Sequence, residues 1–156
     1  MPGPGTAEPD FPGALTFRLD NVTVLSPPPN PTAIIQAGQD LKLKVDLGFD
    51  GHPLFLNCLM AGKQYSVFHH LEREEDGARS TLSGGTFTVP SPPAIASFSV
   101  ETGPYTSGGS GSGTQFEVPA GFDAGTFEVT THIHFADSCV KSFVAAFHQV
   151  YVMVTT

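Results

Sequence analysis

The 156-residue chain is expected to fold as an all-β domain, an antiparallel sandwich of about seven to nine short strands. Three observations predict this class. Apolar and polar residues alternate along several segments, as they do in half-buried strands. The 17 glycines and 14 prolines fall mostly between those segments, where turns are needed. No segment shows a helical period over twelve residues, so no crossover helix is available to join parallel strands.

The first half of the chain supplies two expected strands. Residues 1–13 are rich in Pro and Gly and are expected to form a flexible arm ahead of one domain, 14–156. The strand 15–25 changes the phase of its alternation near Asp20 and Asn21, which predicts a β-bulge there. The strand 40–49 has the most regular alternation in the chain, with one apolar and one polar face.

The middle of the chain is predicted to contain strands at 54–60 and 65–71, joined by a tight turn at 61–63. The charged stretch 72–77 is expected to be a solvated loop. A Gly/Ser-rich stretch, 103–114, is expected to be flexible, and residues 107–113 are compatible with either a natural loop or an engineered linker. The remaining strands are expected at 86–89, 94–100, 116–118, 127–135 and 143–154.

The charge of the chain argues against two classes of partner. Seven basic residues face 15 acidic ones, for a net charge of −8, so nucleic acid and anionic membrane surfaces are disfavoured. No apolar run approaches the roughly 18–20 residues of a membrane-spanning helix. With no Trp and 3 Tyr, a sugar-binding platform is also disfavoured. The N-terminus lacks the pattern of a secretory signal, which favours a cytoplasmic protein, export within an assembly, or prior processing.

Two cysteines, Cys58 and Cys139, lie in or beside expected strands. In an oxidising compartment they could form a disulfide between the sheets, which loop entropy would make worth roughly 4–5 kcal/mol. Without a secretory signal, two reduced thiols are the simpler expectation. The sequence leaves this choice open.

A metal site is the most specific chemistry that the sequence suggests. His132 and His134 are two residues apart on an expected strand, so their side chains share a face. The neighbouring residues His69 and His70 could supply a third ligand if their strand pairs alongside. A divalent transition metal would be the cofactor of such a site. The alternative is that both histidines are ordinary exposed residues of a polar face, with no cofactor.

The last expected strand, 143–154, is apolar on both faces, which is typical of a central or covered strand. Either a loop of the chain covers its outer face, or a second subunit does. In the second case the interface would be formed by the face that carries Val144, Ala146, Val150, Val152 and Val154.

Two blocks resemble bacterial Ig-like and CARDB-like sandwich modules. They are AGQDLKLKVDLGFDG (37–51) and FEVPAGFDAGTFEVTTHIHF (116–135), together 35 of the 156 residues. The resemblance implies an Ig-like fold and transfers no functional residues. A second likeness is confined to the His-x-His pair, which is similar to the start of a cupin metal site, although the second cupin motif is absent.

No nucleophile elbow, phosphate-binding loop or zinc-protease motif occurs, so no complete catalytic site is expected. The first interpretation is therefore a non-enzymatic structural or protein-binding module, self-associating or serving a larger bacterial assembly. The alternative is a small, cupin-like metal-binding protein or enzyme that uses His132 and His134.

Overall fold

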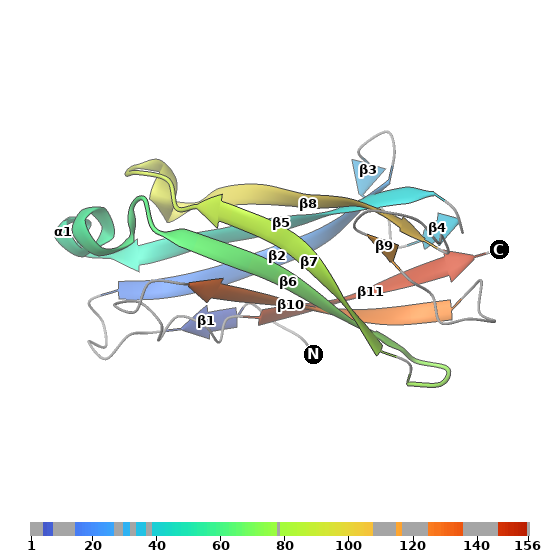
Figure 1. The fold of residues 1–156 in the computed structure, drawn as a ribbon. Coiled ribbons are helices and arrows are strands. Elements are labelled where there is room, and N and C mark those ends of the chain that lie inside the picture. The colour runs from blue at the N-terminus through green and yellow to red at the C-terminus, as the bar shows by residue number, and fades with distance from the viewer. Residues whose placement is uncertain are drawn as a thin grey trace.

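The computed structural model consists of two β-sheets that lie face to face, which confirms the all-β class (Figure 1). The structure describes residues 5–7, 15–26, 30–31, 34–36, 39–77, 79–107, 115–116, 125–135 and 147–155. In this part of the chain no helix is long and apolar enough to cross a membrane.

The first sheet is built around two long antiparallel strands, β2 (Leu15–Ser26) and β5 (Asp40–Gly51). The strand order is β1-β2-β5-β8-β9, and β3 also pairs with β2. The other members are β1 (Gly5–Ala7), β3 (Asn30–Pro31), β8 (Phe98–Ser107) and β9 (Gln115–Phe116). Strand β1 lies inside the stretch that was expected to be a flexible arm.

The second sheet has the order β4-β11-β10-β6-β7. Its strands are β4 (Ile34–Gln36), β6 (Gln64–Arg73), β7 (Arg79–Thr88), β10 (Gly125–Phe135) and β11 (Phe147–Thr155). The expectation of purely antiparallel pairing was wrong at two short ladders, β4 with β11 and β8 with β9, which are parallel. Strands β4 and β11 come from opposite ends of the chain, so their pairing needs no crossover helix.

The core fills the space between the sheets because each long strand presents alternate residues inward. In β5 the buried positions are Leu41, Leu43, Val45, Leu47 and Phe49, and in β10 they are Phe127, Val129, Thr131, Ile133 and Phe135. Aromatic rings join the two layers. Phe135 of the second sheet lies edge-on to Phe17 and Phe49 of the first, with ring centroids 5.6 Å and 6.1 Å apart.

Several expected strands are confirmed. Strand β2 contains a register shift between Leu19 and Asn21, where the change of phase predicts a bulge. Strands β5, β6 and β10 cover the predicted segments and extend them by one to three residues. Strand β7 is longer than expected, because it begins at Arg79 and reaches Thr88.

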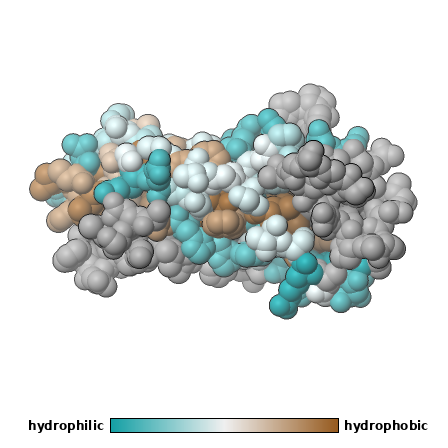
Figure 2. All heavy atoms as spheres, viewed as in Figure 1, coloured by the Kyte–Doolittle hydropathy of each residue, from teal (hydrophilic) through white to brown (hydrophobic). Residues whose placement is uncertain are grey.

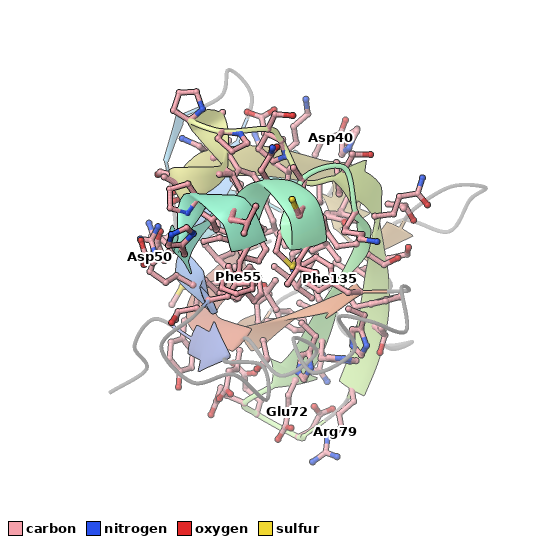
Figure 3. The ribbon with its side chains drawn as sticks, turned by 90° about the vertical axis from the view of Figure 1, so that its left-hand side faces the viewer. Asp40, Asp50, Phe55, Glu72, Arg79 and Phe135 are labelled. Carbon is pink, nitrogen blue, oxygen red and sulfur yellow. The ribbon has the colours of Figure 1, made fainter. Side chains whose placement is uncertain are left out.

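The strand predicted at 54–60 was wrong. Residues 53–60 instead form a helical segment, α1 (Pro53–Phe55) followed by the π-type turn η1 (Leu56–Met60). Pro53 occupies the first helical turn, where a missing N–H costs nothing, and the His52 ring accepts a hydrogen bond from the Leu54 amide. Seen along the strands, this segment lies over one end of the molecule, where Leu56 and Met60 join the core (Figure 3).

Two further expectations differ in detail. Residues 94–96 form a short 3₁₀ turn, η2 (Ala94–Ala96), so β8 begins only at Phe98. The 72–77 stretch was expected to be solvated, yet the Arg73 side chain is buried and pairs with Asp76. Glu75 accepts a hydrogen bond from the Thr126 amide, at 2.9 Å, and so ties the turn to β10.

Candidate functional site

The outer face of the second sheet carries most of the residues singled out by their chemistry. Because Thr131, Ile133 and other odd-numbered residues of β10 point into the core, the even-numbered ones point outward. These are Glu128, Thr130, His132 and His134. The same alternation on β6 turns Phe68, His70 and Glu72 to this face.

The register of β6 against β10 brings a third imidazole to the predicted pair. His70 lies opposite Thr130 and Phe68 lies opposite His132, so His70 and His132 are diagonal neighbours. Their ring centroids are 4.7 Å apart and the rings are perpendicular. His132 and His134 are farther apart, at 6.3 Å, with nearly parallel rings. The closest imidazole pair on this face therefore joins two strands.

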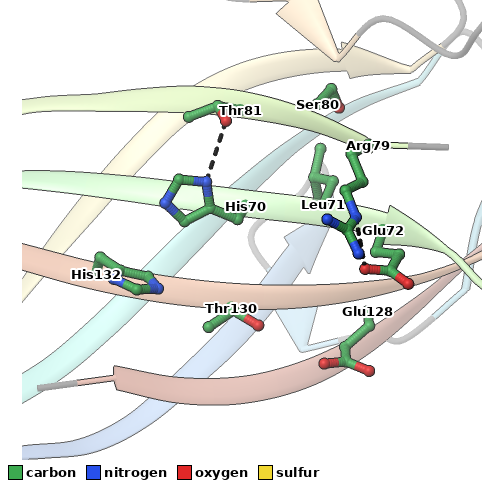
Figure 4. A pocket seen from close by; sticks show the side chains of 9 residues that line it. All are labelled: His70, Leu71, Glu72, Arg79, Ser80, Thr81, Glu128, Thr130 and His132. Carbon is green, nitrogen blue, oxygen red and sulfur yellow. Dashed lines mark hydrogen bonds and ion pairs between the residues drawn. The ribbon is translucent and has the colours of Figure 1, made fainter. Parts of the chain in front are cut away.

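A hollow of about 420 Å³ opens beside this pair, with walls from β7, β6 and β10 (Figure 4). His70 Nδ1 lies 3.1 Å from Thr81 Oγ1, and Arg79 is paired with Glu72 at 3.0 Å. The residues that line the hollow are His70, Leu71, Glu72, Arg79, Ser80, Thr81, Glu128, Thr130 and His132. The hollow thus combines imidazoles, hydroxyls and carboxylates.

The electrostatics of the face favour the neutral form of the His132 imidazole. Partial burial lowers the pKa of His132, and the nearby imidazoles of His70 and His134 lower it further. A second shift occurs on β11, where the Glu128 carboxylate raises the pKa of the Tyr151 hydroxyl. That hydroxyl also lies 3.4 Å from Glu128 Oε2. Glu128 and Tyr151, which are register partners, therefore form a polar contact between β10 and β11.

His69, one of the two residues that the sequence suggested as a third ligand, lies on the opposite side of the sheet. It is fully buried, with Nδ1 2.9 Å from Thr131 Oγ1 and Nε2 2.8 Å from Thr102 Oγ1. Burial lowers its pKa to about 4. His69 therefore cannot join His132 and His134. The sequence does predict this inward position of His69, because Tyr65, Val67 and Leu71 indicate that the odd-numbered residues of this strand face the core.

The apolar part of the outer face lies on β11 and β4, and it differs from the predicted interface. Val152 is buried in the core and Val150 packs against it, so the valine face of β11 points inward. Tyr151 and Met153 point outward and are 48% and 45% exposed. Ile34 of β4, 61% exposed, is the register partner of Met153. Sequence analysis missed Ile34 because this three-residue strand carries too little pattern.

A second exposed apolar group lies at the end of the molecule. Figure 2 shows hydrophobic residues where α1 covers that end, and Leu54 and Phe55 are 60% and 36% exposed there. Cys58, on the adjoining turn η1, is exposed and forms no disulfide with another described residue. The other predicted residues, Val144, Ala146, the side chain of Val154 and Cys139, lie outside what the structure describes, so the disulfide question stays open.

Within the described residues, no three His, Cys, Asp or Glu side chains form a group that could hold a metal ion. What the face does offer is one close pair of imidazoles, carboxylates nearby, and a row of apolar side chains on the adjacent strands.

Comparison with known proteins identifies no family. No protein-family model matches the chain, and no curated protein is similar to it. Among solved structures, the superoxide reductase (neelaredoxin) from Ignicoccus hospitalis matches with a TM-score of 0.31 and 7% sequence identity. The match covers 88% of this chain and 80% of that one. Such a slight likeness indicates neither a family nor an activity.

Proposed function

We propose that this chain is a non-enzymatic, Ig-like β-sandwich module that binds protein through the outer face of its second sheet, with a second copy of itself as the partner. Two facing sheets with a shared core and mostly antiparallel ladders support the Ig-like architecture. The two short parallel ladders lie at or near the sheet edges and leave the central strands antiparallel.

The observation that carries the binding role is the row of Ile34, Tyr151 and Met153. These three large apolar side chains are exposed on adjacent strands, and Ile34 and Met153 are direct register partners. A contiguous apolar patch on a folded domain costs solubility, and such patches mark interaction sites. Only 14% of the residues are charged, below the usual ~25%, which also favours a chain that covers part of its surface.

A second copy fits this face for two reasons. An apolar row can pack on the same row of a partner across a two-fold axis, as isologous dimers require. The rest of the face carries charges of both signs, so a two-fold contact does not have to place one sign of charge against itself. Glu72 and Glu128 provide carboxylates, and Arg79 provides a guanidinium group.

Light scattering on the purified chain over a range of concentrations tests this proposal. We expect the mass to rise from the 16.4 kDa monomer toward the dimer. Met153→Glu and Ile34→Glu should shift the chain to the monomer, because each buries a charge in the contact. Leu54→Glu is the matched control, since it adds the same charge at an exposed apolar position on α1.

Two outcomes would contradict the proposal. The first is a wild-type chain that stays monomeric at millimolar concentration. The second is a dimer that survives Met153→Glu and Ile34→Glu but is lost in Leu54→Glu, which would assign association to the α1 end. Circular dichroism of each variant checks that the fold is retained, as expected for substitutions at exposed positions.

A further inference from the structure

We propose that His70 and His132 together form a binding site for a divalent transition-metal ion on the outer face of the second sheet. This inference goes beyond self-association and does not depend on it. It also differs from what the sequence alone suggests, since the pair joins strands β6 and β10 and includes neither His134 nor His69 as a principal ligand.

The spacing of the two rings fits a shared metal. Zinc lies about 2.0–2.1 Å from each ligating ring nitrogen, so two imidazoles on one tetrahedral ion have ring centroids about 5 Å apart. His70 and His132 have centroids 4.7 Å apart. One imidazole comes from each of two paired strands, so the sheet backbone already places the two residues side by side. Only their side chains must rotate for both rings to face one metal ion.

His134 and His69 do not meet the same requirement. The His134 ring is 6.3 Å from that of His132, which is farther than the spacing of two imidazoles on one tetrahedral ion. His69 is buried on the inner side of the sheet, where Thr131 and Thr102 occupy its two ring nitrogens.

A hydroxyl already orients one of the proposed ligands. Thr81 Oγ1 lies 3.1 Å from His70 Nδ1. When Nδ1 carries the proton it donates to this hydroxyl, and Nε2 keeps the lone pair that a metal requires. Metal-binding histidines commonly have such a partner on the second nitrogen, and its removal typically weakens binding 10- to 100-fold. Thr81 is thus a positioning residue for the site.

The donor set predicts which metals bind. Imidazole nitrogen suits zinc, nickel and copper, whereas calcium and magnesium prefer oxygen ligands. Since no third ligand completes a cluster among the described residues, water or a donor from a partner molecule fills the remaining positions. Glu128 lines the same hollow and adds a negative charge that favours a cation, whereas the charge of Glu72 is offset by Arg79.

Calorimetric titration of metal-free protein with zinc alone tests the site. The Cys58→Ser variant of the full chain serves as the reference, because the exposed Cys58 thiol could bind zinc independently. We expect one equivalent of zinc to bind. His70→Ala and His132→Ala should each weaken binding at least about tenfold, and Thr81→Val should weaken it about tenfold. His52→Ala, which removes an exposed histidine on another element, should leave binding unchanged.

The proposal is overturned if the Cys58→Ser reference binds no zinc, or if the double variant His70→Ala/His132→Ala binds it as tightly as the reference. Circular dichroism confirms folding of each variant. Self-association is measured separately on metal-free protein, so failure of the dimer and failure of the metal site can be told apart.

Discussion

At the scale of single residues, His69 shows how a polar group is accommodated between the two sheets. The Thr102 hydroxyl donates its hydrogen to the Leu43 carbonyl oxygen, at 3.2 Å, so toward His69 it can only accept. His69 Nε2 must therefore carry the proton and donate to Thr102. Nδ1 is then an acceptor for the Thr131 hydroxyl. The neutral ring satisfies every partner, which offsets the cost of burying it.

Protonation of His69 should destabilise the fold in mild acid. The imidazole has a pKa of about 4 in the folded chain and 6.5 as its ordinary value. Between these two pKa values the unfolded chain binds the proton more readily than the folded chain does. The contribution of neutral His69 to the free energy of unfolding is therefore fully present above pH 6.5 and is lost as the pH falls toward 4. Linkage gives a loss of at most about 3 kcal/mol.

Urea unfolding at pH 7 and pH 4.5 measures this loss. The comparison variant is His69→Gln, which keeps a donor and an acceptor but does not titrate. We expect the variant to be less stable at pH 7 and to lose less stability on acidification than wild type. Carboxylates and the other histidines contribute equally to both proteins. Equal pH dependence in both proteins would refute the role of His69.

At the scale of elements, alternation predicted which residues of a strand face inward but not every element type. Strands β2, β5 and β10 have long, regular patterns, and even the bulge near Asn21 was visible as a change of phase. Residues 53–60 are too short and too uniformly apolar for periodicity to separate strand from helix. The signal that was available there was Pro53 after a polar residue, which marks a helix start.

Only part of the candidate site could be predicted, because alternation shows which face of a strand a residue takes but not which strand lies beside it. Alternation placed His132 and His134 on one face, as found. It could not show which strand lies beside β10 or in which register, and the pairing of His70 with His132 depends on both. The valine face of β11 was assigned outward because both faces of that strand are apolar, and pattern alone cannot tell two apolar faces apart.

The helical segment 53–60 should contribute to stability through its buried end. Met60 is fully buried, whereas Leu54 is 60% exposed. Met60→Ala should lower the free energy of unfolding by about 2–5 kcal/mol, because it leaves a cavity under η1. Leu54→Ala should change it by no more than about 0.5 kcal/mol. Urea unfolding monitored by far-UV circular dichroism measures both, and similar losses in the two variants would show that the segment does not close the core.

At the scale of the whole molecule, the two sheets are coupled by two groups of side chains that cross their interface. The His69 group links β6 and β10 of the second sheet to β8 and β5 of the first. Phe135, Phe17, Phe49 and Tyr65 form an aromatic group that also crosses the gap. Neither sheet can expose its inner face without breaking both groups, so the domain should unfold as one unit.

Tyrosine signals allow this cooperativity to be tested, because the chain has no Trp and only 3 Tyr. Tyr65 lies in the aromatic group and Tyr105 lies beside His69, and both are buried. Near-UV circular dichroism therefore reports the packing between the sheets, and far-UV circular dichroism reports the strands. We expect the two thermal transitions to coincide in wild type. Phe135→Ala removes the ring shared by both sheets and should cost about 3–5 kcal/mol, moving both transitions down together. A near-UV transition that precedes the far-UV one would show instead that the sheets separate before they unfold.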